Sequence, residues 1–402
     1  MAYISVAEAA ERWQLSERRV QKFARDGRIL GAKKFSGSWA LPEDAARPQD
    51  PRKPGGAASP KTQAFLLPMP LMNTTFALGQ AAEAVAAISD PDLRQIACAE
   101  LAYFSGRAED AAAIAECYLD SDEPALCLSA CLIFSYANLT LGQIQRARAA
   151  LVRVQQSMDA FDADTPPELR AAGLFIVTTA SVLLHLPLSN EMPELSAAFK
   201  YLPPGLRQFA VYVQAHQKYL ASDYAGSIAV VENALNFERA VYPIPAIYLH
   251  LVAVMDAMSL KDPDRAEAHL LAAWELAQPD DLIEAFGEHH GLLGGMLEAV
   301  IKPKWPEDFK RIIDITYRFS WGWRRVHNPD TGHDVADNLS TTEFAICMLA
   351  ARDWNDGEIA EHLNLSVHTV KSHLSNAYSK LGIKGRRALK DHMLLCFGAE
   401  QE

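Results

Sequence analysis

The side chains best suited to chemistry lie near the C-terminal end of this 402-residue chain, on a predicted helix from about 367 to 381. One side of this helix is an apolar stripe at helical spacing. The other side mixes imidazole, hydroxyl, amide and lysine groups, which can hydrogen-bond base edges and phosphates in the DNA major groove; for the lysines, a solvated helix face is the alternative. The stripe consists of Val367, Val370, Leu374, Ala377 and Leu381. The candidate DNA contacts are His368, Thr369, Lys371, Ser372, Asn376 and Lys380.

A second group of cationic side chains recurs at helical spacing near the N-terminus. Ser16 can cap a helix whose inner stripe is Val20, Phe23 and Ala24, with the cations on its other side. The run from 32 to 41 predicts a hairpin that carries two lysines as a wing. Cations in this arrangement suit phosphates and guanine edges. The candidate DNA contacts here are Arg18, Arg19, Lys22, Arg25, Lys33 and Lys34.

Three helix starts position the C-terminal candidates. Ser340 with Glu343, and Asn355 with Glu358, have the spacing of capping boxes, in which each side chain bonds the other residue's backbone N–H. Ser366 can cap the helix that carries the candidate contacts. Residues 339–388 are therefore predicted to form closely spaced short helices.

These residues resemble the helix-turn-helix pattern of the LuxR family. The resemblance implies a four-helix DNA-binding domain in which the helix from Val367 to Lys380 reads DNA, with Thr369 and Lys371 among its contacts. It also implies that a final helix, from 386 to 396, forms a homodimer. The dimerising face would consist of Ala388, Leu389, Met393 and Leu394. The matching residues are Glu358, Ile359, Ala360, Leu363, Ser366, Thr369, Val370, Lys371, His373, Leu374, Asn376, Tyr378, Lys380, Leu381, Gly382, Arg387 and Ala388.

The N-terminal residues resemble the small winged helix-turn-helix of MerR and excisionase proteins. Ser5 and Glu8 have capping-box spacing before a first helix, and Gly27 can end the second. The resemblance implies a second DNA-binding module. A compact accessory domain, with solvated arginines or a protein-docking role, is the alternative.

The middle of the chain is rich in alanine and leucine and has helical periodicity from about Thr74 to Tyr317. Segments that begin at Cys98, Tyr136 and Gln214 share a pattern of one helix, a short turn and a second helix that opens with small residues. They resemble tetratricopeptide repeats, whose stacked hairpins form a concave surface for a peptide or protein. An unrelated all-helical domain is the alternative.

The predicted fold class is mainly α: a helical-repeat-like array flanked by an N-terminal winged helix-turn-helix and a C-terminal four-helix LuxR-type helix-turn-helix. The stretch 47–61 has the proline and glycine content of an extended linker. The predicted parts are the MerR/excisionase-like module 1–46, the linker 47–61, the tetratricopeptide-like sensor or assembly domain 62–323, a second linker 324–338, and the LuxR-type domain 339–402.

The charge distribution supports this division. The formal net charge is −12, which opposes phosphate binding by the chain as a whole. The acidity lies in the middle, however: residues 1–60 carry +4, residues 61–338 carry −15, and residues 339–402 carry −1. No carboxylate occurs between Glu361 and Asp391, so a basic face can form within the last part.

Several classes of site find no support in the sequence. There is no G-x-x-x-x-G-K-[ST] loop and no Ser/His/Asp or Cys/His arrangement, so neither an enzyme nor a cofactor is expected. Glu284 and the run from Glu288 to His290 contain metal-ligating types, but adjacent histidines point to different helix faces, so no metal site is expected.

The sequence predicts a cytoplasmic protein without a membrane span. The longest weakly polar window, 173–188, is interrupted by polar residues and proline. The six cysteines form no C-x-x-C pair and are expected to be small buried residues in a reducing compartment.

Together these patterns predict a transcription regulator that binds double-stranded DNA as a homodimer and is controlled through its middle domain by a peptide, protein or small ligand. The alternative is a scaffold or peptide receptor that acts through the helical array and uses its end modules for protein contact.

Overall fold

The computed structural model describes residues 3–13, 16–25, 29, 32–35, 38–42, 45, 67–162, 164–183, 195–237, 240–327 and 339–393. The chain divides into two compact units, Met1–Phe65 and Leu66–Glu402. The predicted linker 47–61 lies outside the described residues, as do residues 328–338 of the second predicted linker. The predicted middle and C-terminal domains both fall in the second unit.

The first unit combines two helices with a three-stranded antiparallel sheet. Its strands follow the order β1-β3-β2, with Tyr3 opposite Pro42 and Lys34 opposite Trp39. The elements in chain order are β1 (Tyr3–Ser5), α1 (Val6–Trp13), α2 (Glu17–Arg25), β2 (Lys33–Phe35) and β3 (Ser38–Pro42).

The predicted start of α1 is confirmed. The Ser5 N–H donates to Glu8 Oε2 at 2.7 Å, and the Glu8 N–H donates to Ser5 Oγ at 3.2 Å, which completes a capping box. Behind this start, Trp13, Val20, Phe23 and Leu41 are buried in one core that joins the helices to the sheet. The predicted inner stripe of α2 is therefore buried, while the predicted stop at Gly27 and the hairpin tip lie outside the described residues.

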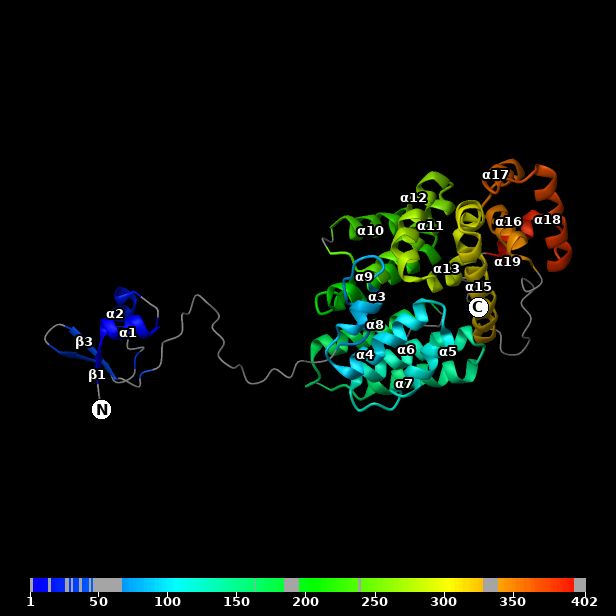
Figure 1. Cartoon of the computed structure of the whole chain (residues 1–402). Helices are drawn as coiled ribbons and strands as arrows, with labels where there is room; N and C mark the ends of the chain where they lie inside the picture. Colours follow the sequence, from blue (N-terminus) through cyan, green and yellow to red (C-terminus); the bar gives the residue numbers. More distant parts are fainter. Residues whose placement is uncertain are drawn as a thin grey trace. The chain divides into compact units, whose positions relative to one another are not determined.

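The second unit is built of helices throughout its described residues (Figure 1). Its middle part contains α3 (Ala81–Ala86), α4 (Pro91–Phe104), α5 (Ala108–Glu116), α6 (Pro124–Thr140), α7 (Ile144–Asp159), α8 (Pro167–Leu183), α9 (Pro204–Leu220), α10 (Tyr224–Phe237), α11 (Pro243–Ser259), α12 (Pro263–Ala277), α13 (Glu284–His289), α14 (Lys302–Lys304) and α15 (Pro306–His327). Short turns of other helix types are η1 (Leu195–Ala198), η2 (Gln278–Asp280), η3 (His290–Leu293) and η4 (Leu297–Ile301). The mainly α fold class is thus confirmed, and α15 extends four residues into the predicted second linker.

The starts of the middle helices follow from local chemistry. Proline lies in the first turn of α4, α6, α9, α11 and α12, where its missing N–H would have no partner in any case. Asp90 and Asp262 cap α4 and α12 by accepting hydrogen bonds from backbone N–H groups of the first turn. The prolines that interrupt the apolar stretches of the sequence therefore mark helix beginnings.

Four pairs of consecutive helices are joined by the same tight turn. In α4–α5, α6–α7, α9–α10 and α11–α12, the residue two positions after the end of the first helix has a positive φ; these residues are Gly106, Gly142, Ser222 and Lys261 respectively. The next N–H donates back five residues, as from Arg107 to the Ala102 carbonyl, which is a Schellman ending. This shared turn places consecutive helices side by side; their assignment as tetratricopeptide-like repeats stays a prediction.

The segment before α3 is fixed inside the helical core by buried polar groups. The Glu100 carboxylate accepts the N–H groups of Leu71 and Met72 at 2.9 and 3.0 Å, and Ser129 Oγ accepts the Met69 N–H at 2.9 Å. Burial raises the pKa of Glu100 to about 8 despite these hydrogen bonds. Met69 and Met72 are thereby held against the helices.

The cysteines only partly follow expectation. Cys127, Cys131 and Cys347 are buried, and Cys98 is partly buried. Cys117 is exposed, which corrects the prediction for this residue; it follows the last residue of α5, where the chain turns toward solvent. Cys396 lies outside the described residues.

Candidate nucleic-acid interface

The C-terminal helices begin where the sequence predicts. They are α16 (Thr341–Ala351), α17 (Asp356–His362), α18 (Val367–Leu381) and α19 (Arg386–Met393). Ser340 with Glu343, and Asn355 with Glu358, form complete capping boxes. Ser366 Oγ accepts the Thr369 N–H at 3.0 Å and caps α18. All three predicted helix starts are confirmed.

The apolar stripe of α18 fixes the orientation of this helix. Val370, Leu374, Ala377 and Leu381 are at most 4% exposed. Val367, which the sequence placed in the same stripe, is 43% exposed and corrects that prediction. The neighbouring Ser366 and His368 are also exposed, so the first turn of α18 projects beyond the core on which the rest of the helix packs.

The side of α18 opposite the stripe carries the predicted contacts. His368, Lys371, Ser372, Asn376 and Lys380 are exposed, and Thr369 is partly buried. The Thr369 hydroxyl also lies 2.7 Å from Ser366 Oγ, so it shares in the helix cap. The structure therefore brings the six candidates together on one helix.

Ion pairs within the C-terminal domain distinguish its cations. Lys380 Nζ lies 2.7 Å from Glu343 Oε2 on α16, and Lys390 Nζ lies 2.7 Å from Asp353 Oδ2. Burial acts to raise the pKa of Glu343, but the Lys380 hydrogen bond and the Ser340 N–H hold it below its usual range. Arg386 pairs with Asp356.

No carboxylate among the described residues pairs with Lys371, Lys384 or Arg387, although all three lie in the predicted basic run. Of these, only Lys371 was among the predicted contacts. Lys384 and Arg387 are exposed as well. The sequence could not separate paired from unpaired cations, because the partner carboxylates lie 30 to 37 residues away.

The geometry of this domain agrees with its similarity to known proteins. The model of the family described as "Bacterial regulatory proteins, luxR family" matches residues 337–393. These residues are a LuxR-family helix-turn-helix domain. The match covers the four helices α16 to α19 and confirms the resemblance for this part of the chain.

Two curated proteins are similar to a short part of this chain. "Spore germination protein GerE" of Bacillus subtilis (strain 168) is 44% identical over 48 residues, which are 12% of this chain and 65% of that protein. "Probable transcriptional regulatory protein SgaR" of Hyphomicrobium methylovorum is 37% identical over 54 residues, which are 13% of this chain and 26% of that protein. The matched region thus covers less than two thirds of either relative. No solved structure matches the chain.

The last helix of the LuxR-family domain, α19, includes three of the four predicted dimerising residues, Ala388, Leu389 and Met393. Leu389 is 0% exposed, within the core of the unit, and Ala388 is partly buried. The side chain of Met393 and all of Leu394 lie outside the described residues. Leu389 is therefore engaged within its own chain, and the dimer stays a prediction.

The LuxR-family domain is seated on the middle helices through α16 and α17. Arg352, 8% exposed, donates from Nη2 to the Tyr219 hydroxyl at 2.7 Å and to the Leu292 carbonyl at 2.8 Å. Lys261 Nζ donates to the Asp353 carbonyl at 2.7 Å. These hydrogen bonds join α16 and its C-terminal end to α9, α11 and η3.

Glycines allow close packing between the LuxR-family domain and the middle helices. A Cβ atom at Gly291 would lie 2.5 Å from the Phe344 ring of α16, so only glycine leaves room for the ring. Gly295 has φ +78 and faces Leu363, which follows α17. The glycine-rich run from 291 to 295, which forms most of η3 and the turn after it, therefore packs closely against the LuxR-family domain.

In the first unit, the predicted DNA-contacting side chains that the structure describes are exposed to solvent. Arg18, Lys22 and Arg25 are exposed on α2, and Lys33 and Lys34 are exposed on β2. The ammonium of Lys33 lies 5.7 Å from the centre of the Tyr3 ring. The side chain of Arg19 lies outside the described residues. Binding of DNA by this unit stays a prediction.

The residues considered for a metal site have other partners. The His289 ring lies 2.8 Å from the Tyr212 hydroxyl and 2.7 Å from the Ala285 carbonyl. His290 Nε2 lies 2.8 Å from Glu298 Oε1. Across the described residues, no group of three or more potential ligands could hold a metal ion. None of the helices within these described residues combines the length and the apolar character of a membrane span.

Proposed function

We propose that this chain is a DNA-binding transcription regulator in which α18 reads the major groove. The observation that carries the proposal is the exposed polar side of α18 on a domain that matches the LuxR-family model. A helix packed by one apolar stripe can enter the groove with its other side free. His368, Ser372 and Asn376 are assigned to base edges or phosphates, and Lys371 to a phosphate.

The presence or absence of a carboxylate partner distinguishes the roles of the cations. Lys371, Lys384 and Arg387 are assigned to phosphate contacts, because no described carboxylate neutralises them. Lys380 is assigned a second role, since its pairing with Glu343 ties α18 to α16. Thr369 contributes to the helix cap as well as to the interface.

We assign control of DNA binding to the middle helices. The support is the seat of the LuxR-family domain: Arg352 and Lys261 form hydrogen bonds between that domain and α9, α11 and η3. If these helices have two arrangements, a ligand that binds one of them more tightly shifts the population toward it. The orientation of the DNA-binding domain would change with that shift. The tetratricopeptide-like hairpins would provide the ligand-binding surface.

Two further assignments complete the proposal. The LuxR-family domains act in pairs through the region around α19, so the DNA site would be an inverted repeat. The N-terminal unit acts as a second, MerR-like DNA reader through the exposed cations of α2 and β2. A tethered second reader would raise the local concentration of the first at its site.

The proposal is tested by selecting genomic DNA fragments with the purified full-length protein at two salt concentrations. Enrichment of an inverted repeat at both salts supports a sequence-specific regulator. Non-specific phosphate binding would retain all DNA fragments equally at low salt and release them as the salt concentration rises. That result would contradict the proposal. The helical array as a peptide receptor would then be the function to pursue.

A further inference from the structure

Two thiols of α6 lie one helical turn apart. Cys127 belongs to the first turn of this 17-residue helix and Cys131 to the second. Side chains four residues apart share one face of a helix, and the Cys131 thiol forms a hydrogen bond with the Cys127 sulfur. Their spacing is C-x-x-x-C, one residue longer than the C-x-x-C pair that the sequence lacks. The middle helices therefore contain a dithiol.

The Cys127 sulfur lies among hydrogen-bonding groups. Its thiol donates to the Leu119 carbonyl, with 3.3 Å between sulfur and oxygen, and the Ser157 hydroxyl lies 3.7 Å from the sulfur. Side chains in the first turn of a helix point toward the N-terminus, where the positive end of the helix dipole favours an anion. The hydrogen bond from Cys131 lowers the pKa of the Cys127 thiol, burial opposes this effect, and Ser157 lowers the pKa further. Of the two thiols, Cys127 therefore more readily becomes a thiolate, the nucleophilic form of cysteine.

The other described cysteines lack this arrangement. Burial raises the pKa of the Cys347 thiol to about 12. Cys117 is exposed, and its thiol donates to the Ala113 carbonyl at 3.6 Å. Among the described residues, no hydrogen bond joins Cys98, Cys117 or Cys347 to a second thiol. Contact between two thiols, and not exposure, therefore distinguishes the pair on α6.

Closing this pair into a disulfide requires a small movement within α6. Four residues of helix rise by about 6 Å, which is within the range for the Cα atoms of a disulfide. The Cβ atoms of such a pair are about 5 to 6 Å apart, however, and a disulfide needs about 3.5 to 4.5 Å. The first turn of α6 can supply the movement, because Glu123 at its N-cap makes no side-chain hydrogen bond to the helix, unlike Asp90 at α4 and Asp262 at α12.

We propose that Cys127 and Cys131 form a site of reversible oxidation, at which hydrogen peroxide converts the two thiols into a disulfide. A thiolate-forming cysteine next to a second, resolving thiol is the arrangement of redox-sensing sites. Cys127 is 8% exposed and Cys131 0%, which favours an oxidant as small as hydrogen peroxide. As a signal for DNA binding the site rests on the proposed function; as an oxidation site it does not.

The oxidation has two steps. The Cys127 thiolate attacks one oxygen of hydrogen peroxide; a sulfur–oxygen bond forms, the oxygen–oxygen bond breaks, and the departing hydroxide takes a proton from solvent and leaves as water. The product is a sulfenic acid. The Cys131 sulfur then attacks the Cys127 sulfur, the disulfide forms, and the hydroxyl group leaves as water with the Cys131 proton. Both sulfur atoms are oxidised and the peroxide is reduced; dithiothreitol reverses the result by thiol–disulfide exchange and becomes a cyclic disulfide.

The test exposes the unsubstituted full chain to hydrogen peroxide, without DNA, and then alkylates all remaining thiols after unfolding. Mass spectrometry with fragmentation locates each cysteine and its oxidation state. Cys127 and Cys131 should lose their free thiols together, about tenfold faster than the exposed Cys117, and dithiothreitol should restore them. Oxidation of Cys117 at an equal or higher rate, or full alkylation of Cys127 after the peroxide treatment, overturns the proposal.

Two variants separate the steps. Cys131→Ser removes the resolving thiol, so a sulfenic acid should accumulate at Cys127, where dimedone traps it during unfolding. Cys127→Ser removes the nucleophile and should slow the oxidation of Cys131 about tenfold or more. Cys347→Ser is the matched control, because Cys347 is another buried thiol, and it should leave the rate of disulfide formation unchanged. Undiminished oxidation of Cys131 in Cys127→Ser contradicts the assignment of Cys127 as the nucleophile.

Discussion

Lys371 and Lys380 are both exposed on α18 but lie on opposite flanks of its buried stripe and in different electrostatic surroundings. Lys380 is paired with Glu343 at 2.7 Å, and Lys371 has no such partner among the described residues. The helical period of the sequence was enough to place both outside the buried stripe, because periodicity depends only on neighbouring residues. It could not find the ion pair, because Glu343 belongs to a different helix.

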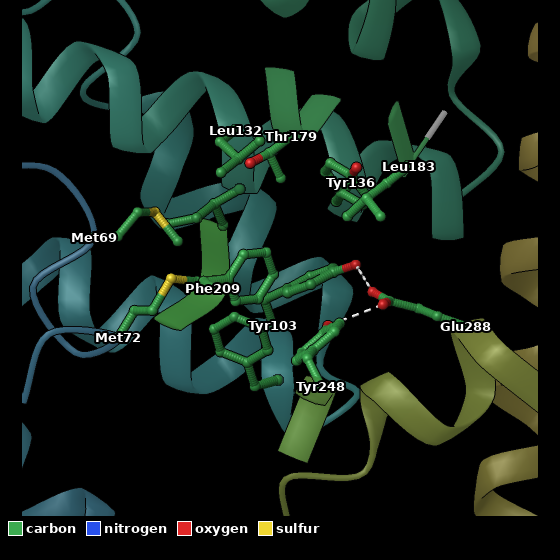
Figure 2. A pocket seen from close by; sticks show the side chains of 12 residues that line it. Met69, Met72, Tyr103, Leu132, Tyr136, Thr179, Leu183, Phe209, Tyr248 and Glu288 are labelled. Carbon is green, nitrogen blue, oxygen red and sulfur yellow. Dashed lines mark hydrogen bonds between the residues drawn. The ribbon is translucent and has the colours of Figure 1, made fainter. Parts of the chain in front are cut away.

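The hydrogen bonds of Glu288 (Figure 2) were beyond the reach of sequence reasoning for the same reason. The sequence marked Glu288 only as part of a weak metal-ligating cluster. Its actual neighbours, Tyr103 and Tyr248, lie 185 and 40 residues away. Contacts of that span come from tertiary packing and leave no local spacing to detect.

Glu100 gives a residue-scale prediction of pH dependence. Its pKa is raised in the folded chain to about 8, from the ordinary value of about 4.3. A raised folded pKa contributes stability that is lost as pH rises through that value, about 1.4 kcal/mol between pH 7 and pH 9. Glu100→Gln should therefore flatten the fall in unfolding free energy over this range.

Denaturant unfolding of the two proteins at pH 7, 8 and 9 measures this difference. Glu83→Gln is the control, since Glu83 is exposed on α3, and it should reproduce the unsubstituted slope. The same slope in Glu100→Gln would show that Glu100 does not titrate there.

At the scale of elements, helix starts were more predictable than helix pairings. The capping residues Ser340, Asn355 and Ser366 act on backbone groups two or three positions away, so sequence spacing identifies them. Two of the four shared hairpin turns end at glycine, but Ser222 and Lys261 adopt the same positive φ without it. A search for glycine therefore finds only part of the repeated architecture.

Arg352 is the element-scale test of the seat between the LuxR-family domain and the middle helices. Arg352→Ala removes the hydrogen bonds to Tyr219 and Leu292 and leaves both groups without this partner. Amide exchange in α16 and η3 should accelerate, because local opening of the seat costs less free energy. Hydrogen exchange detected by mass spectrometry measures the effect.

Arg311→Ala is the matched control, since Arg311 forms an exposed ion pair with Asp281 in the same unit. Exposed pairs contribute about 0 to 1 kcal/mol, so exchange in α16 should not change. Equal protection of α16 in Arg352→Ala and the unsubstituted protein would show that Arg352 does not hold the seat.

At the scale of the whole molecule, the sequence predicted the mainly α class and the C-terminal DNA-binding domain. Its division into a middle and a C-terminal domain stays a prediction; both predicted domains lie in one compact unit, Leu66–Glu402. The contacts responsible, from Arg352 and Lys261, join residues that are distant in sequence. The N-terminal unit is compact by itself. Whether it contacts DNA together with the LuxR-family domain is tested on the whole chain.

Deletion of residues 1–58 tests that second reader. If the exposed cations of α2 and β2 contact DNA, the shortened protein should bind selected fragments more weakly, by tenfold or more for a tether that raises local concentration. It should also enrich a shorter sequence. Selection and affinity measurements that match those of the full chain would remove the N-terminal unit from DNA recognition.

The central claim, that α18 reads DNA, is tested most directly by measuring affinity for the enriched site and a shuffled one as a function of salt. Full-length protein is compared with Lys371→Ala and with Lys310→Ala, an exposed lysine of α15. Lys371→Ala is predicted to weaken binding about tenfold or more and to reduce the salt slope by about one phosphate contact, while Lys310→Ala changes neither. Identical affinities and slopes for all three proteins would contradict the account.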